Sequence, residues 1–377
     1  MTATNPAPTG AVLHPDLTQA QRDCLDALPL TGRHLVSGPP GSGKSLIAAH
    51  RAVHLALTGR STVLLTRSNL LRQLLQPVLS DLRVPGMDLN ASTVHSWIGT
   101  RFGRGVVSTP DGWFDWTALT AAAAASIDAS ETIVSPHLVV DEGQDLPPGF
   151  YKMARLTGVS ITVLADECQR LTDTNSTLDE IASALGGATW CHTIAGNHRN
   201  TREIASFAEY FRVGGDRPVL PFRSGPRPEI RCYSGSKGIA DDIATLAVRA
   251  PKQRIGVIVN SLRTGADLTR RLERANLPSE PQLYSSAATQ AGRYRDLDLT
   301  RPGVVLVHRA SAKGLDFDTV VIADTETDAG ADPTDATLRM AYYVMATRAR
   351  ERLILGWQGT RLPRHLEGLN GWATMRS

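Results

Sequence analysis

Two stretches of the sequence have the residue types and the spacing of a nucleotide-hydrolysing site. The sequence GPPGSGKS at 38–45 combines glycines, whose backbone N–H groups can curl around phosphates, with Lys44 and Ser45. Lys44 is expected to reach the outer phosphates and Ser45 to ligate Mg²⁺. Further along, an apolar run ends in Asp141 and Glu142. Asp141 can hold the same ion, and Glu142 can orient and deprotonate the attacking water. The residues predicted to surround the phosphates are Gly38, Pro39, Pro40, Gly41, Ser42, Gly43, Lys44 and Ser45.

A phosphate loop needs a strand before it and a helix after it, and the surrounding pattern supplies both. Short apolar runs alternate with helical stretches in each half of the chain, which is typical of parallel α/β sheets. In the first half the pattern predicts strands at 34–38, 61–66, 136–142 and 160–166, and helices at 44–58, 69–82 and 148–157. In the second half it predicts strands at 229–234, 254–260, 303–309 and 319–324, and helices at 201–212, 237–249, 264–276 and 335–350.

Composition is that of a globular protein. The 377 residues suffice for two or three domains, and 42% are apolar while 20% are charged. A net charge of +3 permits contact with polyanions without requiring it. The four cysteines are scattered, so neither zinc nor a disulfide framework is predicted, and they fit a reducing cytoplasm. The N-terminus lacks the features of a signal peptide. The apolar run at 118–127 is too short and too rich in alanine to span a bilayer, and predicts a surface helix.

Six further blocks accompany these two stretches. They are LTQAQ (17–21), STVHSW (92–97), VLADECQR (163–170), GNHRN (196–200), SAKGLDFDTVVIAD (311–324) and YYVMATRARERLIL (342–355). Together with GPPGSGKS and DEGQD, and in this order, they resemble the motifs of superfamily 1 helicases of the UvrD/Rep type. The resemblance covers nearly the whole chain. It implies two tandem RecA-like P-loop domains, expected at 1–192 and 193–377, with a short insertion at about 98–135.

The resemblance also assigns roles around the nucleotide. Gln21 would read the adenine edge, which favours ATP over GTP, and Gln169 would sense the γ-phosphate. His198, which replaces a tyrosine of the family, would stack on adenine. The second-domain residues Gly314 and Asp316 belong to the nucleotide-binding set, with Asp316 standing where the family has Glu.

Two arginines are expected to complete the catalytic site. A P-loop on one domain does not by itself supply arginines to the γ-phosphate. The resemblance assigns this task to Arg199 and Arg348 of the second domain, which would neutralise charge developing in the transition state. The pair Gln144 and Asp145, which follows Asp141 and Glu142, would relay the state of the γ-phosphate to that second domain.

The positions that resemble the DNA-contacting motifs depart more from the family. The predicted nucleic-acid residues are Thr66, Arg67, Asn69, Thr93 and His95. Arg67 stands where the family has a stacking Phe, and residues 170–177 lack an aromatic where a Trp is usual. Each missing aromatic ring removes roughly 1–3 kcal/mol of stacking free energy per base. Both large accessory domains of the family are missing or reduced. In the short first insertion, Trp113, Phe114 and Trp116 either stack on bases or pack on the core, and their apolar and acidic neighbours favour the core.

These observations predict an Mg²⁺-dependent ATPase stimulated by single-stranded DNA, with RNA as an alternative, and a candidate 3′-to-5′ translocase or helicase in DNA repair or phage defence. A separate nuclease or other protein partner fits such a role, whereas a membrane does not. The alternative is a regulatory switch whose two domains close on ATP to control a protein partner, without processive unwinding. The altered residues at the positions that resemble DNA-contacting motifs favour the switch, and the block at 92–97 favours the motor.

Overall fold

The fold is known from a computed structural model, which describes residues 17–82, 87, 89–103, 108–128, 136–166, 175–186, 189–214, 217–284 and 296–376. These residues form two compact units, one ending at Gly196 and the other beginning at Asn197. We call them the N-terminal unit and the C-terminal unit. Within the described residues, no helix combines the length and the apolar character needed to cross a membrane.

The N-terminal unit is built on a six-stranded sheet in the order β3-β2-β4-β5-β1-β6, with every neighbouring pair parallel. All residues of its central strands β4 and β5 are buried because both faces of a parallel sheet are covered, and the two polar residues among them, His137 and Thr162, lie 2.9 Å apart as a hydrogen-bonded pair. The strands are β1 (Arg33–Ser37), β2 (Thr62–Thr66), β3 (Ala91–Thr93), β4 (His137–Val140), β5 (Ile161–Ala165) and β6 (Trp190–Thr193).

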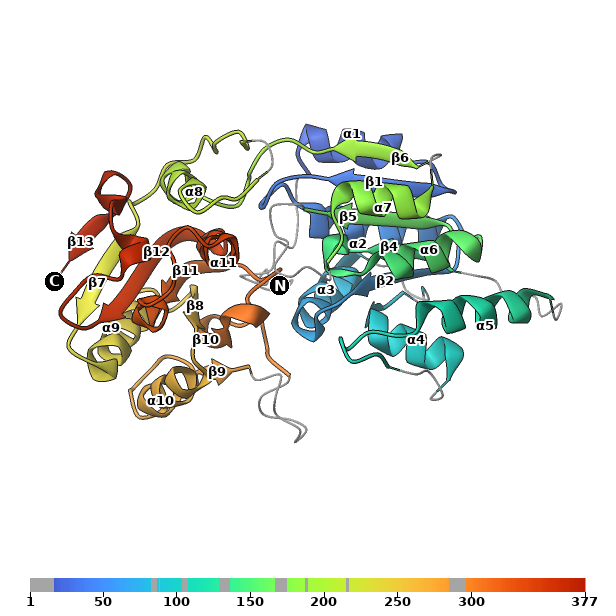
Figure 1. Cartoon of the computed structure of the whole chain (residues 1–377). Helices are drawn as coiled ribbons and strands as arrows, with labels where there is room; N and C mark the ends of the chain where they lie inside the picture. The colour runs from blue at the N-terminus through green and yellow to red at the C-terminus, as the bar shows by residue number, and fades with distance from the viewer. Residues whose placement is uncertain are drawn as a thin grey trace, which may run out of the picture. The chain divides into compact units, whose positions relative to one another are not determined.

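Helices cover this sheet in two groups (Figure 1). One group is centred on α2, which contacts α1 and α3, and the other on α6, which contacts α5 and α7. The second group and the sheet enclose a core that includes Trp113 and Phe114. The helices are α1 (Gln19–Ala27), α2 (Lys44–Leu57), α3 (Asn69–Leu82), α4 (Val94–Phe102), α5 (Trp116–Asp128), η1 (Gly143–Asp145), α6 (Pro148–Leu156) and α7 (Leu178–Leu185).

The C-terminal unit contains a seven-stranded sheet in the order β13-β7-β12-β11-β8-β10-β9, again parallel throughout. The strands are β7 (Glu229–Tyr233), β8 (Arg254–Val259), β9 (Gln282–Leu283), β10 (Gly303–His308), β11 (Phe317–Ile322), β12 (Ala349–Gln358) and β13 (Thr374–Arg376). The helices are α8 (Arg202–Glu209), α9 (Ser236–Arg249), α10 (Leu262–Glu273), η3 (Arg309–Ser311), η4 (Thr325–Asp328), α11 (Ala336–Ala346), η5 (Arg364–Leu366) and η6 (Leu369–Gly371).

The predicted fold class is confirmed: the chain is α/β, with two parallel sheets flanked by helices in the manner of tandem RecA-like domains. The predicted helix at 335–350 is wrong at its end, because α11 stops at Ala346 and β12 starts at Ala349. At this end the Thr347 hydroxyl and Arg348 Nε both donate to the Val344 carbonyl at 3.0 Å, so side chains satisfy a carbonyl of the last helical turn. The predicted surface helix at 118–127 is confirmed as part of α5.

Candidate nucleotide and nucleic-acid site

The phosphate loop joins β1 to the first turn of α2 in the N-terminal unit. Gly43 adopts a left-handed conformation with φ +88°, and a side chain there would collide with the Gln21 amide. The Lys44 ammonium folds back onto the loop, where Nζ donates to the Gly38 carbonyl at 2.6 Å and the Pro39 carbonyl at 2.9 Å. Nζ also lies 3.3 Å from Oδ2 of Asp166, at the end of β5. The loop thus holds a buried ammonium whose partners a phosphate can replace.

Gln21, the predicted adenine reader, has both ends of its amide engaged within this unit. Its Nε2 donates to the Ser42 carbonyl at 2.8 Å, and its Oε1 accepts from the Thr18 backbone N–H at 2.9 Å. The second bond belongs to a capping box at the start of α1. Gln21 therefore fixes the position of the phosphate loop relative to α1, and its adenine contact stays a prediction.

Asp141 lies one residue beyond β4 and has the environment of a cation ligand. Its carboxylate is buried, and among the described residues neither oxygen meets a donor at normal hydrogen-bond geometry. Burial and the neighbouring Glu142 raise the pKa of Asp141, against the lowering influence of the Ser45 hydroxyl and Lys44. A carboxylate and a hydroxyl are the oxygen ligands that a largely hydrated Mg²⁺ takes in P-loop proteins, so this pair fits the ion.

Glu142 is the one non-glycine residue with positive φ (+53°) in the described part of the chain. Such a conformation costs on the order of 1–3 kcal/mol and persists only where neighbours impose it. Its carboxylate accepts a hydrogen bond from the Gln144 side chain, and Gln144 Oε1 accepts from the Asp166 backbone N–H at 2.9 Å. Lys44, Asp166, Gln144 and Glu142 thus form one connected set, in which Gln144 bonds the Asp166 backbone, so a change at the phosphate loop can reach the Glu142 carboxylate.

The turn that carries Glu142 is also held from two other sides. The Tyr151 hydroxyl donates to the Gly143 carbonyl, and an added Cβ at Gly143 would lie 2.9 Å from that hydroxyl. Tyr151 therefore fills the space beside Gly143. On the other side, Asn175 Nδ2 donates to the Asp145 carboxylate at 3.2 Å.

Gln144 and Asp145 consequently contact both described flanks of the segment that contains Gln169. The Gln144 side chain bonds Asp166 ahead of that segment, and the Asp145 carboxylate bonds Asn175 after it. Gln169 itself lies outside the described residues. Sequence reasoning did not select Asp166 or Tyr151. Asp166 had a usable signal, because it ends an apolar strand as Asp141 does, whereas nothing local marks Tyr151.

The residues predicted to contact nucleic acid come together at the carboxyl ends of two neighbouring strands. Thr66 at the end of β2 is in register with Thr93 at the end of β3. Asn69 begins α3, and Thr93 caps α4 by accepting from the Ser96 backbone N–H at 3.1 Å. The carboxyl ends of β1, β4 and β5, which carry the nucleotide residues, lie on the same edge because the sheet is parallel throughout.

Arg67 and His95 of this group converge on the short insertion. The Arg67 guanidinium lies 5.1 Å from the centre of the Trp113 ring, and the His95 ring stacks on Trp113 at 5.0 Å. His95 Nε2 is also 2.9 Å from the Gly112 carbonyl. Trp113 and Phe114 are 2% and 8% exposed, so the expectation that they pack on the core is confirmed. Arg67 thus makes a cation–π contact with a ring of the protein itself.

The C-terminal unit holds the other predicted nucleotide residues. Arg199 Nε is 3.9 Å from Oδ2 of Asp316, whose other oxygen is 3.4 Å from Arg254. Burial alone would raise the pKa of Asp316, but Arg199, Arg254 and neighbouring arginines outweigh it and lower that pKa. Asn200 Nδ2 donates to the carbonyls of Thr347 and Ala349. The segment that carries Arg199 is therefore hydrogen-bonded to the residues before and after Arg348.

Arg348, the predicted arginine finger, is fully buried. Beside its bond to Val344, its guanidinium donates to the Leu315 carbonyl at 3.3 Å and the Thr347 hydroxyl at 3.1 Å. A nucleotide contact would require these bonds to be exchanged, so the finger role stays a prediction. His198 is exposed, and Gly314 adopts φ +77° in the turn before β11. Their nucleotide contacts are likewise predictions.

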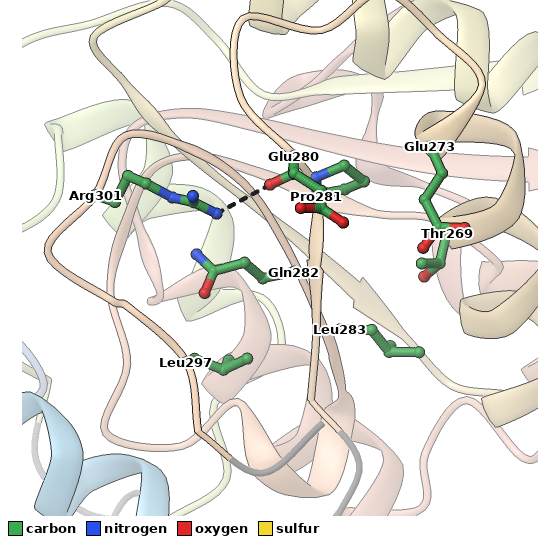
Figure 2. A pocket seen from close by; sticks show the side chains of 8 residues that line it. All are labelled: Thr269, Glu273, Glu280, Pro281, Gln282, Leu283, Leu297 and Arg301. Carbon is green, nitrogen blue, oxygen red and sulfur yellow. Dashed lines mark hydrogen bonds between the residues drawn. The ribbon is translucent and has the colours of Figure 1, made fainter. Parts of the chain in front are cut away.

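A separate cavity of about 130 Å³ lies beside β9 in the C-terminal unit (Figure 2). Arg301 Nη2 donates to the Glu280 carbonyl at 3.1 Å across its rim. The residues that line it include none of the predicted site residues; they are Thr269, Glu273, Glu280, Pro281, Gln282, Leu283, Leu297 and Arg301.

No protein-family model and no curated protein matches this chain. Solved structures with partial similarity include a C-terminal domain described as that of a possible DNA helicase from Lactobacillus plantarum, with 22% identity, a TM-score of 0.35, and coverage of 47% of this chain and 97% of that one. Arterivirus nonstructural protein 10, a helicase, has 12% identity, a TM-score of 0.43 and coverage of 94% and 63%. The PRRSV helicase has 12% identity, a TM-score of 0.43 and coverage of 93% and 55%. The chain thus spans less than two thirds of each viral helicase, and likeness at this level assigns no activity.

Proposed function

We propose that the protein is an Mg²⁺-dependent ATPase of the UvrD/Rep-like helicase type, stimulated by single-stranded DNA and stepping along it from 3′ to 5′. The observation that carries the proposal is the shared edge of the N-terminal sheet. Residues suited to phosphate binding end β1, β4 and β5, and residues suited to strand binding end β2 and β3. Both groups sit on one rigid parallel sheet, which suits coupling between them.

In this proposal Lys44 exchanges the carbonyls of Gly38 and Pro39 for the outer phosphates of ATP. Asp141 and Ser45 would hold Mg²⁺, which would neutralise phosphate charge when bound. Glu142 accepts a proton from the attacking water, and its position is set by Gln144.

The remaining roles complete the assignment. Gln21 and His198 contact adenine, and Gln169 senses the γ-phosphate. Gly314 and Asp316 belong to the nucleotide-binding set. Arg199 and Arg348 stabilise the charge of the transition state. Thr66, Arg67, Asn69, Thr93 and His95 form the surface for the strand.

ATP turnover with and without single-stranded DNA tests the proposal. Turnover should rise on addition of oligo-dT at low salt, where phosphate contacts are strongest. RNA oligonucleotides are tested in the same way. Stimulation by RNA and not by DNA would show that the strand is RNA. An absence of stimulation by both would refute the motor and leave the regulatory switch.

The variant Glu142→Gln tests the chemical assignment. It keeps the size of the side chain but removes its basicity, so turnover should fall by at least about 100-fold while ATP affinity is retained. The matched control is Glu180→Gln, which alters a carboxylate in the capping box of α7 and should leave turnover unchanged.

A further inference from the structure

A continuous series of aromatic rings joins the strand-binding residues to the catalytic turn within the N-terminal unit. We call Trp113, Phe114, Trp116, Phe150 and Tyr151 the aromatic column. Trp116 lies 6.1 Å from Trp113 and 5.7 Å from Phe114, measured between ring centres. It lies 5.9 Å from Phe150 on α6, and Phe150 lies 5.4 Å from Tyr151. The spacings are those of packed aromatic pairs, which interact beyond simple burial.

Each end of the column contacts a group that the proposed function uses. At one end, Arg67 lies over Trp113 and His95 stacks on it. At the other end, the Tyr151 hydroxyl donates to the Gly143 carbonyl, next to Glu142 in its left-handed conformation. The column is thus a physical connection between the strand surface and the residue that activates water.

The middle of the column is closely fitted. A Cβ added at Gly149, in the first turn of α6, would lie 2.5 Å from Cδ1 of the Trp116 indole. Trp116 can therefore shift little without moving α6, and α6 carries both Phe150 and Tyr151. Packed interiors transmit such displacements because they are dense and have discrete arrangements.

We propose that the aromatic column couples nucleic-acid binding at Arg67 and His95 to the catalytic turn at Gly143, with Trp116 as its central positioning residue. A strand phosphate or base that recruits Arg67 competes with the cation–π contact to Trp113. The resulting shift passes through Trp116 and α6 to Tyr151, and changes how the turn holds Glu142. The inference rests on the proposed function, since it explains how the strand would stimulate hydrolysis.

Trp116→Leu is the principal test, because leucine keeps an apolar side chain but removes the ring contacts. ATP turnover and oligo-dT affinity are measured separately, the second by anisotropy of a labelled oligonucleotide. We expect basal turnover and affinity to stay within about twofold of wild type, while maximal stimulation falls by a factor in the range of about 5–150, as is typical for lost coupling. Trp116→Phe should restore part of the stimulation.

Coupling between two binding free energies is reciprocal, so the effect of ATP binding on oligo-dT affinity gives a readout that a merely structural role does not move. In the wild type, a non-hydrolysable ATP analogue should change oligo-dT affinity, and in Trp116→Leu this change should disappear. Trp190→Leu is the matched control. Trp190 belongs to the same unit but stacks on His192 in β6, outside the column.

The outcomes separate the inference from the proposed function. If oligo-dT and oligo-U neither bind the wild type nor stimulate it, the proposed function fails. If the wild type is stimulated and Trp116→Leu is stimulated equally, the column carries no coupling. If Trp116→Leu needs a higher oligo-dT concentration for half-maximal stimulation but still reaches the wild-type maximum, Trp116 is a binding residue and the inference is wrong. Should Trp116→Leu fail to fold, Tyr151→Phe, which keeps the ring and removes the bond to Gly143, must lose stimulation or the inference is wrong.

Discussion

Replacement of Gly143 by alanine should destabilise the N-terminal unit and impair hydrolysis together. The added methyl group would collide with Val163 on β5 and approach the Tyr151 hydroxyl to 2.9 Å. Both neighbours are fully buried, so neither can move into solvent. Overpacking of this kind costs about 1–3 kcal/mol. If Tyr151 moves away instead, the Gly143 carbonyl loses its partner, at a similar cost of about 1–3 kcal/mol.

The assay is urea unfolding combined with ATP turnover, for Gly143→Ala, Val163→Ala and the double variant. Val163→Ala alone leaves a cavity and should cost about 2 kcal/mol. In the double variant the new methyl group occupies that space, so the two penalties should fall short of additivity by at least about 1 kcal/mol. Additive penalties would show that Gly143 and Val163 do not compete for space. An unchanged stability and turnover in Gly143→Ala would refute the close packing around the turn altogether.

Three further predictions follow from the same geometry. Gln144→Ala removes the hydrogen bond that orients Glu142, so turnover should fall at least tenfold while ATP affinity stays nearly unchanged. Equal losses of turnover and ATP affinity would show instead that Gln144 acts in ATP binding. Arg199→Ala should lower turnover by about 10³-fold if Arg199 stabilises the transition state as an arginine finger does, and it should also lower stability in urea, since Arg199 is one of the charges that hold the buried Asp316 carboxylate ionised; Arg199→Lys should not restore the rate. Burial lowers the pKa of His34 to about 4 and of His137 to about 3, so the unfolded chain takes up protons at a higher pH than the folded chain does. The free energy of unfolding should therefore fall as pH drops below about 6.5, by up to about 1.4 kcal/mol per pH unit for each ring. A urea midpoint that stays constant between pH 7 and pH 5, or one that falls equally with pH in the double variant His34→Gln/His137→Gln, would contradict this.

Local sequence signals were sufficient for the phosphate loop and for the four central strands of the N-terminal sheet, but not for its edge strands β3 and β6 or for β9, β12 and β13 of the other sheet. The mostly apolar runs before Asp141 and Asp166 are buried strands because a parallel sheet is covered on both faces. The helix predicted through residue 350 failed for a tertiary reason. From Ala349 onward the chain pairs with the distant strand β11, with Ala349 opposite Phe317, so a strand takes the place of further helical turns. Helical periodicity contains no information about that pairing.

Contacts between distant segments account for what the sequence did not predict at the site. The sequence predicted Arg67 and His95 as strand contacts but gave no sign that both rest on Trp113. It identified Gly143 as a departure from the family, but not Tyr151, eight residues further on. Each pairing exists because the fold brings the insertion and α6 against the ends of the strands.

The departures from the family pattern are therefore connected to one another. Where the family has a stacking Phe, this chain has Arg67, and the ring that Arg67 contacts is Trp113 of the insertion. Where the family has Phe in the catalytic turn, this chain has Gly143, and Tyr151 occupies adjoining space. Trp113 and Tyr151 belong to the same series of packed rings. Aromatic side chains absent from the two motifs are thus matched by aromatic side chains packed nearby, and the insertion supplies Trp113 and Trp116 to that packing.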